Sequence, residues 1–280
     1  MSLPRLLVEP IVRAALAEDL GRAGDLTTDA TVPADRLGSV DLVARDPGVM
    51  AGTDCAVLAW TLLDPEVQVQ IDLPDGSRVE PGHRIGTATG RARSLLTGER
   101  VALNFLGHLS GVATATAQLV AAVEGTHTRI CDTRKTTPGL RSLEKAAVKA
   151  GGGHNHRFGL DDAILIKDNH IAYAGGITVA VRSARAAVGH LVKIEVEVDT
   201  LEQLDELLTC DADVVLLDNM SPQELAEAVR RVDGRLVTEA SGRITPERAA
   251  ALAASGVDLI SAGWLTHSAP VLDIGLDARL

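Results

Sequence analysis

The spacing of apolar side chains changes along the chain and predicts different elements in its two halves. Residues 4–20 repeat apolar positions at helical spacing and end before Gly21, so they predict one amphipathic helix. Farther along, short apolar runs of β type lie at residues 39–44, 67–73 and 85–89, with turn residues between them. The first part of the chain therefore predicts a helix and a small sheet.

A long helical pattern follows, from about residue 94 to residue 123. We expect this helix to be broken near Ser110 and Gly111. Three polar residues recur every four positions along one of its faces: Arg100, Asn104 and His108. Such a stripe is most often a solvated face, and the spacing alone assigns it no function.

After residue 125 short apolar runs alternate with helical windows. The strand candidates are residues 128–131, 164–166, 192–196, 214–217, 236–238 and 259–260. The helical windows are residues 143–150, 179–188, 201–208, 222–232 and 246–254. Apolar strands with helical crossovers form a parallel sheet covered by helices, either as a barrel or as a doubly wound sheet. We favour the barrel.

Polar residues follow these strands directly. They are Thr133, Arg134 and Lys135, then residues 167–170, Glu197, Asp218 with Asn219, residues 239–242, and residues 261–263. One such residue alone is most often a helix cap or part of a surface loop. In a barrel, however, the carboxyl ends of all parallel strands meet at one mouth, so six strands with this pattern favour a site.

The composition is that of a globular enzyme with two domains, or with a barrel and an appended domain. The 280 residues are 46% hydrophobic and 23% charged. The three cysteines lie far apart without metal-binding or disulfide spacing, which fits a reducing cytoplasm. No apolar stretch approaches the roughly 20 residues of a membrane span, so we expect neither export nor membrane anchoring.

The charge distribution restricts the kind of partner. A net charge of −11 with only 2% aromatic residues excludes a nucleic-acid surface with stacking platforms. Residues 129–170 are nevertheless rich in Arg and Lys. Because so many cations in loops repel one another unless an anion compensates them, we expect an anionic substrate with several charges.

Four of these cations suit two neighbouring carboxylates on one ring: Arg134, Lys135, Arg157 and Lys167. Arginine binds a carboxylate through two parallel hydrogen bonds, whereas lysine supplies a more compact charge. The H-x-H pair at residues 154–156 invites a zinc interpretation. We reject it because no third ligand has supporting spacing and Arg157 would repel the ion. We expect His156 to donate a hydrogen bond to an anion instead.

Glu197 and Asp218 follow adjacent strands and offer the hard oxygen ligands that Mg²⁺ binds together with phosphate oxygens and water. Glu195 and Asp199 compete for this role, and we prefer Glu197 because it stands at the end of its strand. These carboxylates therefore predict a magnesium site.

The last two strands each end in a turn of small residues, Ser241-Gly242 and Ser261-Ala262-Gly263. In barrels this is the usual place of a phosphate pocket made of backbone N–H groups and a helix N-terminus. A Ser-Gly pair alone is a weak signal, and its position after these strands strengthens it.

With these residues in place, the sequence closely resembles the nicotinate-nucleotide pyrophosphorylase (carboxylating), or quinolinate phosphoribosyltransferase, family over nearly its whole length. The matching stretches are EDLGRAGDLTT (18–28), ERVALNFL (99–106) with Ser110 and Gly111, TRKTTPGLR (133–141), GGGHNHR (151–157), IKDNH (166–170), EVE (195–197), LDN (217–219), EASG (239–242) and SAG (261–263). The TRKT and HNHR stretches are highly specific.

The resemblance implies an α/β fold: an incomplete (β/α) barrel of the type II phosphoribosyltransferase kind with an N-terminal α/β sandwich domain. We expect the sandwich at residues 1–110, with the tail 270–280 returning to it, and the barrel at residues 111–269. Members of the family work as homodimers or larger homo-oligomers. This implies that Arg100 enters the site of the neighbouring subunit.

The resemblance also implies a reaction of quinolinate with phosphoribosyl pyrophosphate that depends on Mg²⁺ and yields nicotinate mononucleotide, pyrophosphate and CO2. The implied quinolinate pocket contains Thr133, Arg134, Lys135, His156, Arg157 and Lys167, with Arg100 from the neighbouring subunit. Glu197 and Asp218 are implied to bind magnesium and the ribose. The implied phosphate contacts are Ser241, Gly242, Ser261, Gly263 and His267, and the implied catalytic residues are Lys135, Lys167, Glu197 and Asp218.

Two other functions remain open at this point. The first is an enzyme with the same fold that uses another pyridine or base, such as nicotinate, as its substrate. A comparison of the turnover of quinolinate and nicotinate would separate the two activities. A barrel that senses phosphoribosyl pyrophosphate without turnover is the other alternative. The presence of Glu197, Asp218 and Lys167 counts against it.

Overall fold

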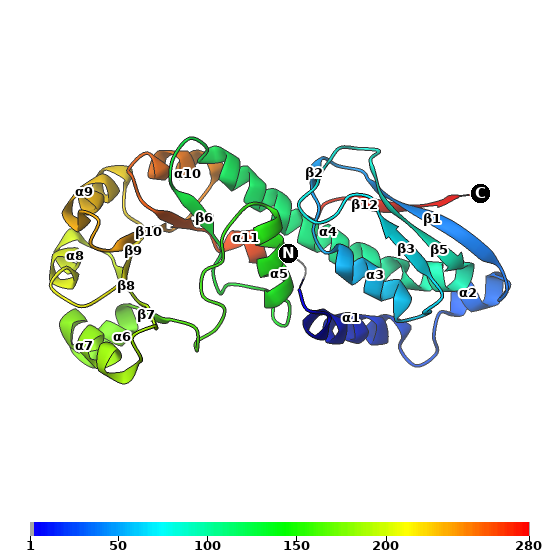
Figure 1. Cartoon of the computed structure of the whole chain (residues 1–280), viewed down its shortest axis with the longest axis horizontal. Coiled ribbons are helices and arrows are strands. Elements are labelled where there is room, and N and C mark those ends of the chain that lie inside the picture. Colours follow the sequence, from blue (N-terminus) through cyan, green and yellow to red (C-terminus); the bar gives the residue numbers. More distant parts are fainter. Residues whose placement is uncertain (1–2, 280) are drawn as a thin grey trace. The chain divides into compact units, whose positions relative to one another are not determined.

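The computed structural model describes residues 3–279, which divide into two compact units (Figure 1). Among the described residues, the first unit comprises residues 3–117, 136–152 and 265–279. The second comprises residues 118–135 and 153–264. The chain therefore passes between the units four times.

The first unit contains an antiparallel sheet with the strand order β12, β1, β5, β3. Its strands are β1 (Leu37–Ala44), β3 (Gln68–Ile71), β5 (Arg84–Arg91) and β12 (Ile274–Arg279), with a separate pair β2 (Gly48–Val49) and β4 (Arg78–Val79). Its helices are α1 (Arg5–Leu20), α2 (Leu26–Thr31), α3 (Thr53–Thr61), α5 (Arg141–Ala150) and most of α4 (Ala92–Ala122). The helix and strands predicted for this part are confirmed, and β12 joins the end of the chain to β1.

The core of the first unit is aliphatic around one tryptophan. Val12 of α1, Leu42 of β1 and Ile85 of β5 are fully buried in it. Trp60 of α3 is buried as well, and its Nε1 donates a 2.9 Å hydrogen bond to the carbonyl oxygen of Leu95. Each such side chain contributes about 1.5 to 3 kcal/mol by leaving water. A chain with 2% aromatic residues thus depends on close aliphatic packing.

Helix α4 is continuous from Ala92 to Ala122, so the break expected near Ser110 and Gly111 is wrong. Oγ of Ser110 accepts a 3.0 Å hydrogen bond from the backbone N–H of Ala51. A Cβ atom at Gly111 would lie 2.1 Å from the carbonyl oxygen of Pro270. Ser110 and Gly111 are therefore small because neighbouring segments pack closely against the helix at these positions, and they do not interrupt it.

Helix α4 also corrects the expectation that no segment reaches the length of a membrane span. By length and composition alone it is long and apolar enough to cross a membrane. Its apolar window, however, is 61% buried inside the protein. A helix in the core of a protein can be as long and as apolar as a membrane span, and the burial of α4 is that of a core helix.

The second unit is a parallel sheet with the strand order β6, β11, β10, β9, β8, β7. The strands are β6 (Arg129–Cys131), β7 (Ile164–Ile166), β8 (Ile194–Val198), β9 (Val214–Asp218), β10 (Val237–Ser241) and β11 (Leu259–Ser261). The helices are α6 (Asp168–Ala174), α7 (Ile177–Ala187), α8 (Leu201–Leu207), α9 (Pro222–Val232) and α10 (Pro246–Ala253). The short α11 (Trp264–His267) begins at the last residue of this unit and continues into the first unit.

These strands form an incomplete barrel. β6 and β7 stand at the two edges of the curved sheet, and α7 to α10 lie along its outside (Figure 1). All six predicted strands and the predicted helices between them are present. Helix α6 was not predicted, because its first residues were interpreted as a loop after β7.

Side-chain caps determine where the outer helices begin. Thr200, Ser221 and Thr245 each accept a hydrogen bond from the backbone N–H three residues later. Pro222 and Pro246 stand in the first turn of α9 and α10, where a helix has no use for the missing N–H. Each cap stabilises its helix by about 1 kcal/mol. Because each cap determines the first residue of its helix, it also determines the length of the loop between that helix and the preceding strand.

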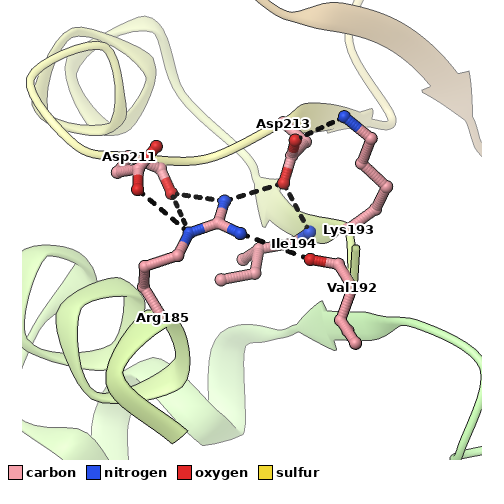
Figure 2. A network of polar contacts seen from close by, with 6 residues as sticks. All are labelled: Arg185, Val192, Lys193, Ile194, Asp211 and Asp213. Carbon is pink, nitrogen blue, oxygen red and sulfur yellow. Dashed lines mark hydrogen bonds and ion pairs between the residues drawn. The ribbon is translucent and has the colours of Figure 1, made fainter. Parts of the chain in front are cut away.

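A polar network ties α7 to the N-terminal ends of β8 and β9 (Figure 2). Asp213 accepts hydrogen bonds from Arg185 Nη2 at 2.7 Å, Lys193 Nζ at 2.6 Å and the backbone N–H of Ile194 at 2.9 Å. Partial burial opposes ionisation, but these hydrogen bonds outweigh it and lower the pKa of Asp213 to about 2. The network lies at the ends of the strands opposite to their carboxyl ends.

Candidate active site

A pocket of about 380 Å³ opens at the carboxyl ends of the parallel strands. Its lining residues all belong to the second unit: Thr133, Arg134, Lys135, His156, Arg157, Leu165, Lys167, Glu197, Leu216, Asp218, Glu239, Ser241 and Ser261. All of them except Leu165, Leu216 and Glu239 were predicted from the sequence as site residues. The cations of the sequence interpretation thus converge on one pocket.

The alternation of side chains along the strands explains this convergence, because positions two residues apart point to the same face. Glu197 of β8 pairs with Leu216 of β9, which pairs with Glu239 of β10. The three residues therefore form one row across the sheet. In the next row, Asp218 pairs with Ser241. Both rows contribute side chains to the pocket.

Asp132, directly after β6, positions the loop that carries His156. Its carboxylate is fully buried and accepts hydrogen bonds from the backbone N–H of His156 at 2.9 Å and from Asn155 Nδ2 at 2.6 Å. A parallel bridge between Cys131 and His154 joins the start of the loop to β6. The loop thus enters the pocket as an extension of the sheet.

Arg134 and Arg157 bring two guanidinium groups into the pocket. Nε of each side chain is buried and has no hydrogen-bond partner. Nη1 of Arg157 donates a 2.7 Å hydrogen bond to the carbonyl oxygen of Ala163, which holds the side chain against the loop before β7. Burial and the like charge of Arg134 lower the pKa of Arg157. Because unpaired buried cationic donors are costly, this arrangement suits an anion.

Lys167 and Glu197 form an ion pair inside the pocket. Lys167 directly follows β7 and is the N-cap residue of α6. Asp218, the last residue of β9, accepts a 2.5 Å hydrogen bond from Asn219 Nδ2. Glu197 and Asp218 are both partly accessible from the pocket. This donor set fits Mg²⁺, which takes one or two protein carboxylates beside phosphate oxygens and water.

Two glycines permit close approaches beside the small residues that line the pocket. Gly242 has a φ of +108°, and a Cβ atom there would lie 2.2 Å from Asn219 Oδ1. A Cβ atom at Gly263 would lie 2.8 Å from Lys135 Cδ. The turns after β10 and β11 therefore require glycine, while Ser241 and Ser261 face the pocket.

Four predicted site residues do not line this pocket: Arg100, Gly242, Gly263 and His267. Gly242 and Gly263 stand beside Ser241 and Ser261, whereas Arg100 and His267 are exposed residues of the first unit, so their roles stay predictions. Asn104 and His108, from the same face of α4 as Arg100, line a second pocket of about 370 Å³ near the end of α1. There His108 Nε2 lies 2.8 Å from a carboxylate oxygen of Glu144.

The hydrogen bonds of His156 lie within the protein in this structure, so its expected contact with a substrate anion stays a prediction. Nδ1 accepts a 2.7 Å hydrogen bond from the backbone N–H of Arg157, so we place the proton on Nε2. Nε2 in turn lies 2.9 Å from Glu195 Oε2. Both ring nitrogens are thus used within the protein. The ring lines the pocket, and its hydrogen bonds order the backbone of Arg157.

Two buried glutamates received no catalytic or binding role from the sequence. Glu239 was expected at the barrel mouth with residues 239–242, and Glu195 was considered only as a rival magnesium ligand. Glu239 of β10 lines the pocket and is 1% exposed, while Glu195 of β8 is 6% exposed. One oxygen of each and a ring nitrogen of His156 lie within 4.8 Å of one another. Their spacing in the sequence was the signal that could have indicated a role. Glu195 stands two residues before Glu197, and Glu239 stands two residues before Ser241, so each shares a face of its strand with a predicted site residue.

Comparisons with known proteins match nearly the whole chain. The family model described as quinolinate phosphoribosyl transferase, C-terminal domain, matches residues 112–277, and the one for the N-terminal domain matches residues 25–110. The nicotinate-nucleotide pyrophosphorylase (carboxylating) of Mycobacterium leprae is 48% identical over 274 residues, which cover 95% of each chain. The probable enzyme of the same name from Bacillus subtilis is 44% identical over 275 residues, covering 98% of this chain and 94% of the relative.

A solved structure agrees with these matches. The nicotinate-nucleotide pyrophosphorylase from Francisella tularensis aligns with a TM-score of 0.95 and 38% identity, covering 99% of this chain and 98% of that chain. The expected fold class, an antiparallel α/β domain followed by an incomplete parallel barrel, is therefore confirmed. By these matches and by the residues that line its pocket, the chain belongs to the quinolinate phosphoribosyltransferase family.

Proposed function

We propose that this protein is a quinolinate phosphoribosyltransferase (decarboxylating) of NAD biosynthesis. It joins quinolinate to phosphoribosyl pyrophosphate and forms nicotinate mononucleotide, pyrophosphate and CO2. The two family models and the relatives at 44% and 48% identity support this activity.

The buried Nε atoms of Arg134 and Arg157 are the strongest support for quinolinate as the substrate. Each guanidinium can bind one carboxylate, and the two carboxylates of quinolinate occupy neighbouring positions on its ring. Thr133, Lys135 and Lys167 line the same pocket and add a hydroxyl and two compact charges. A monocarboxylate such as nicotinate would leave one half of this cationic pocket uncompensated.

Phosphoribosyl pyrophosphate then occupies the side of the pocket formed by β8 to β11. Glu197 and Asp218 would hold Mg²⁺, which supplies positive charge to the departing pyrophosphate. Lys167 is paired with Glu197 in this structure. A metal ion bound by Glu197 would therefore either displace the ammonium group of Lys167 or share the carboxylate of Glu197 with it. The phosphate contacts of the proposal are Ser241, Gly242, Ser261, Gly263 and His267.

The chemistry follows from this placement of charges. The lone pair of the pyridine nitrogen attacks the anomeric carbon while the bond from that carbon to pyrophosphate breaks. Glu197 and Asp218 favour the positive charge that develops on the ribose ring. The alkylated nitrogen is cationic, so it stabilises the electron pair that remains on the adjacent carbon when CO2 leaves. Decarboxylation therefore needs no further cofactor.

Several features of the working enzyme extend this proposal. Arg100 is contributed to the pocket by the neighbouring subunit of a homodimer or larger homo-oligomer. The enzyme works in the cytoplasm, which its three free cysteines support. The sandwich domain spans residues 1–110 with the tail 270–280, and the barrel domain spans residues 111–269.

Parallel assays of pyrophosphate and CO2 test the proposal. The purified protein is incubated with Mg²⁺, phosphoribosyl pyrophosphate and either quinolinate or nicotinate. We expect equal amounts of pyrophosphate and CO2 with quinolinate and negligible pyrophosphate with nicotinate. Turnover of nicotinate at a similar rate, or binding of phosphoribosyl pyrophosphate without any turnover, would contradict the proposal.

A further inference from the structure

Glu239 is a buried acid in the floor of the pocket that no step described so far uses. It lines the pocket, its side chain is almost completely buried, and its Oε1 has no hydrogen-bond partner. Its Oε2 lies 3.8 Å from His156 Nε2. A carboxylate in such a place lacks most of the solvation that stabilises its charge, and one of its oxygens lacks a hydrogen bond.

His156 does not provide the missing positive charge. Because Nδ1 accepts the N–H of Arg157, the ring is neutral and carries a single proton on Nε2. Glu195 receives that proton's hydrogen bond at 2.9 Å, which leaves Glu239 with the longer contact. Two carboxylates therefore lie close together with no cation between them, so protonation of Glu239 removes the repulsion between two buried negative charges.

The groups that face Glu239 support this conclusion. Burial and the negative charge of Glu195 raise the pKa of Glu239 to about 7, and Asp132 adds to the increase. A positive charge on His156 would oppose the increase, but the neutral ring carries none, and the hydrogen bond from the hydroxyl of Ser261 opposes it. The pocket above also contains charged residues from the surrounding elements: Arg134, Lys135, Arg157, Lys167, Glu197 and Asp218. Near neutral pH a substantial share of Glu239 is therefore an acid that can give up a proton.

We propose that Glu239 supplies the proton that replaces CO2 on the pyridine ring. This inference rests on the proposed function and deepens it. When the bond between the ring and the departing carboxylate breaks, its electron pair stays on the ring carbon beside the cationic nitrogen. That pair takes the proton of Glu239 and forms the new C–H bond. Glu239 becomes a carboxylate and recovers a proton from solvent before the next turnover.

The proton determines whether decarboxylation is completed. Until the ring carbon is protonated, CO2 can recombine with the carbanion, so the supply of the proton commits the reaction. A positioned acid of this kind contributes roughly 100- to 10,000-fold to rate. The position of Glu239 at the pocket floor also favours it over water as the proton donor, because water that enters from the open side must pass the bound substrate.

A metal ion at His156, Glu195 and Glu239 is the competing interpretation of this cluster. It requires a free electron pair on His156 Nε2, which carries the proton in the observed hydrogen-bond pattern. A neutral acid at Glu239 requires no such change in the hydrogen bonds of His156.

Single-turnover measurements of both products on Glu239→Gln test the inference. Enzyme in excess is mixed with phosphoribosyl pyrophosphate, Mg²⁺ and quinolinate labelled in the carboxylate that is lost. We expect CO2 formation to slow by about 100-fold, far more than pyrophosphate formation, so that quinolinate mononucleotide accumulates. Glu239→Asp keeps the acid and should restore part of the CO2 rate.

The two products also separate the possible outcomes. A parallel loss of CO2 and pyrophosphate in Glu239→Gln, or no loss of either, overturns the role of Glu239. Absence of both products with the unaltered enzyme contradicts the proposed function instead. If Glu239→Gln does not fold, the pH dependence of the two steps in the unaltered enzyme still tests the inference. Its CO2 step should decline as the pH rises through about 7 while its pyrophosphate step does not, and parallel profiles would overturn the inference.

Discussion

Arg134 and Arg157 line the same pocket, and Nε of each is buried without a hydrogen-bond partner. Two like charges in one partly buried place repel each other, and burial together with the charge of Arg134 lowers the pKa of Arg157. The fold keeps them together because Arg134 follows β6 and Arg157 is held by Ala163. An anion with two negative charges removes this repulsion and satisfies both donors.

Arg134→Ala should therefore lose quinolinate turnover. Removal of one partner of a buried charge pair costs about 2 to 5 kcal/mol, which corresponds to a loss of roughly 30- to 5,000-fold in kcat/KM for quinolinate. Steady-state kinetics with each substrate varied in turn measure this effect. The exposed Arg182→Ala is the matched control and should leave kcat/KM unchanged. Near-normal kinetics of Arg134→Ala would refute its role in binding.

Removal of the divalent cation should stop the reaction. Chelation with EDTA is expected to abolish pyrophosphate formation, and added Mg²⁺ should restore it, because the leaving group carries several negative charges. Glu197→Gln keeps the shape of the side chain and removes its charge, so it should raise the Mg²⁺ concentration needed for half-maximal rate. Full activity in EDTA would exclude Glu197 and Asp218 as metal ligands.

Gly242→Ala should weaken the binding of phosphoribosyl pyrophosphate. The added Cβ would lie 2.2 Å from Asn219 Oδ1 at a backbone φ of +108°, so the turn after β10 must shift. We expect KM for phosphoribosyl pyrophosphate to rise by about tenfold, the equivalent of about 1.4 kcal/mol. Gly125→Ala is the control, since it has a φ of +82° with no atom within 4 Å of the new Cβ. An equal effect on KM in both variants would contradict the assignment of this turn.

Asp213→Asn should reduce stability in a manner that depends on pH (Figure 2). The pKa of Asp213 is about 2 in the folded protein, below its ordinary value of 3.8, so its contribution is fully present above about pH 4 and is lost as the pH falls toward 2. At neutral pH we expect the variant to unfold with about 1 to 2 kcal/mol less free energy.

Chemical denaturation at several pH values checks this expectation. The difference between Asp213→Asn and the unaltered protein should shrink between about pH 4 and about pH 2. Asp211 pairs with the same Arg185, but its side chain is 79% exposed, so Asp211→Asn should cost less than about 0.5 kcal/mol. A difference that stays constant with pH would show that the charge of Asp213 is not responsible.

Sequence periodicity was sufficient for the barrel but not for the long helix. The six strands and the helices between them were predictable because the apolar runs and their caps, such as Ser221 and Thr245, repeat in a regular order. Helix α4 was expected to break at Ser110 and Gly111. The requirement for small residues there comes from Ala51 and Pro270, which are distant in sequence.

The pocket shows the same division. Arg134, Arg157 and Lys167 were predictable because each lies close after a strand or belongs to a specific motif. Glu239 was expected at the barrel mouth, but its grouping with His156 and Glu195 was missed, since only the register shows which residues of neighbouring strands share a face. The hydrogen bonds of His156 likewise depend on how the backbone places Arg157 beside its ring.

A calorimetric titration of quinolinate and nicotinate into the protein tests the central claim most directly. If Arg134 and Arg157 grip two adjacent carboxylates, quinolinate should bind at least about tenfold more tightly than nicotinate, and Arg134→Ala should remove most of the difference. Equal affinity for the two ligands would contradict a pocket built for a doubly charged ring.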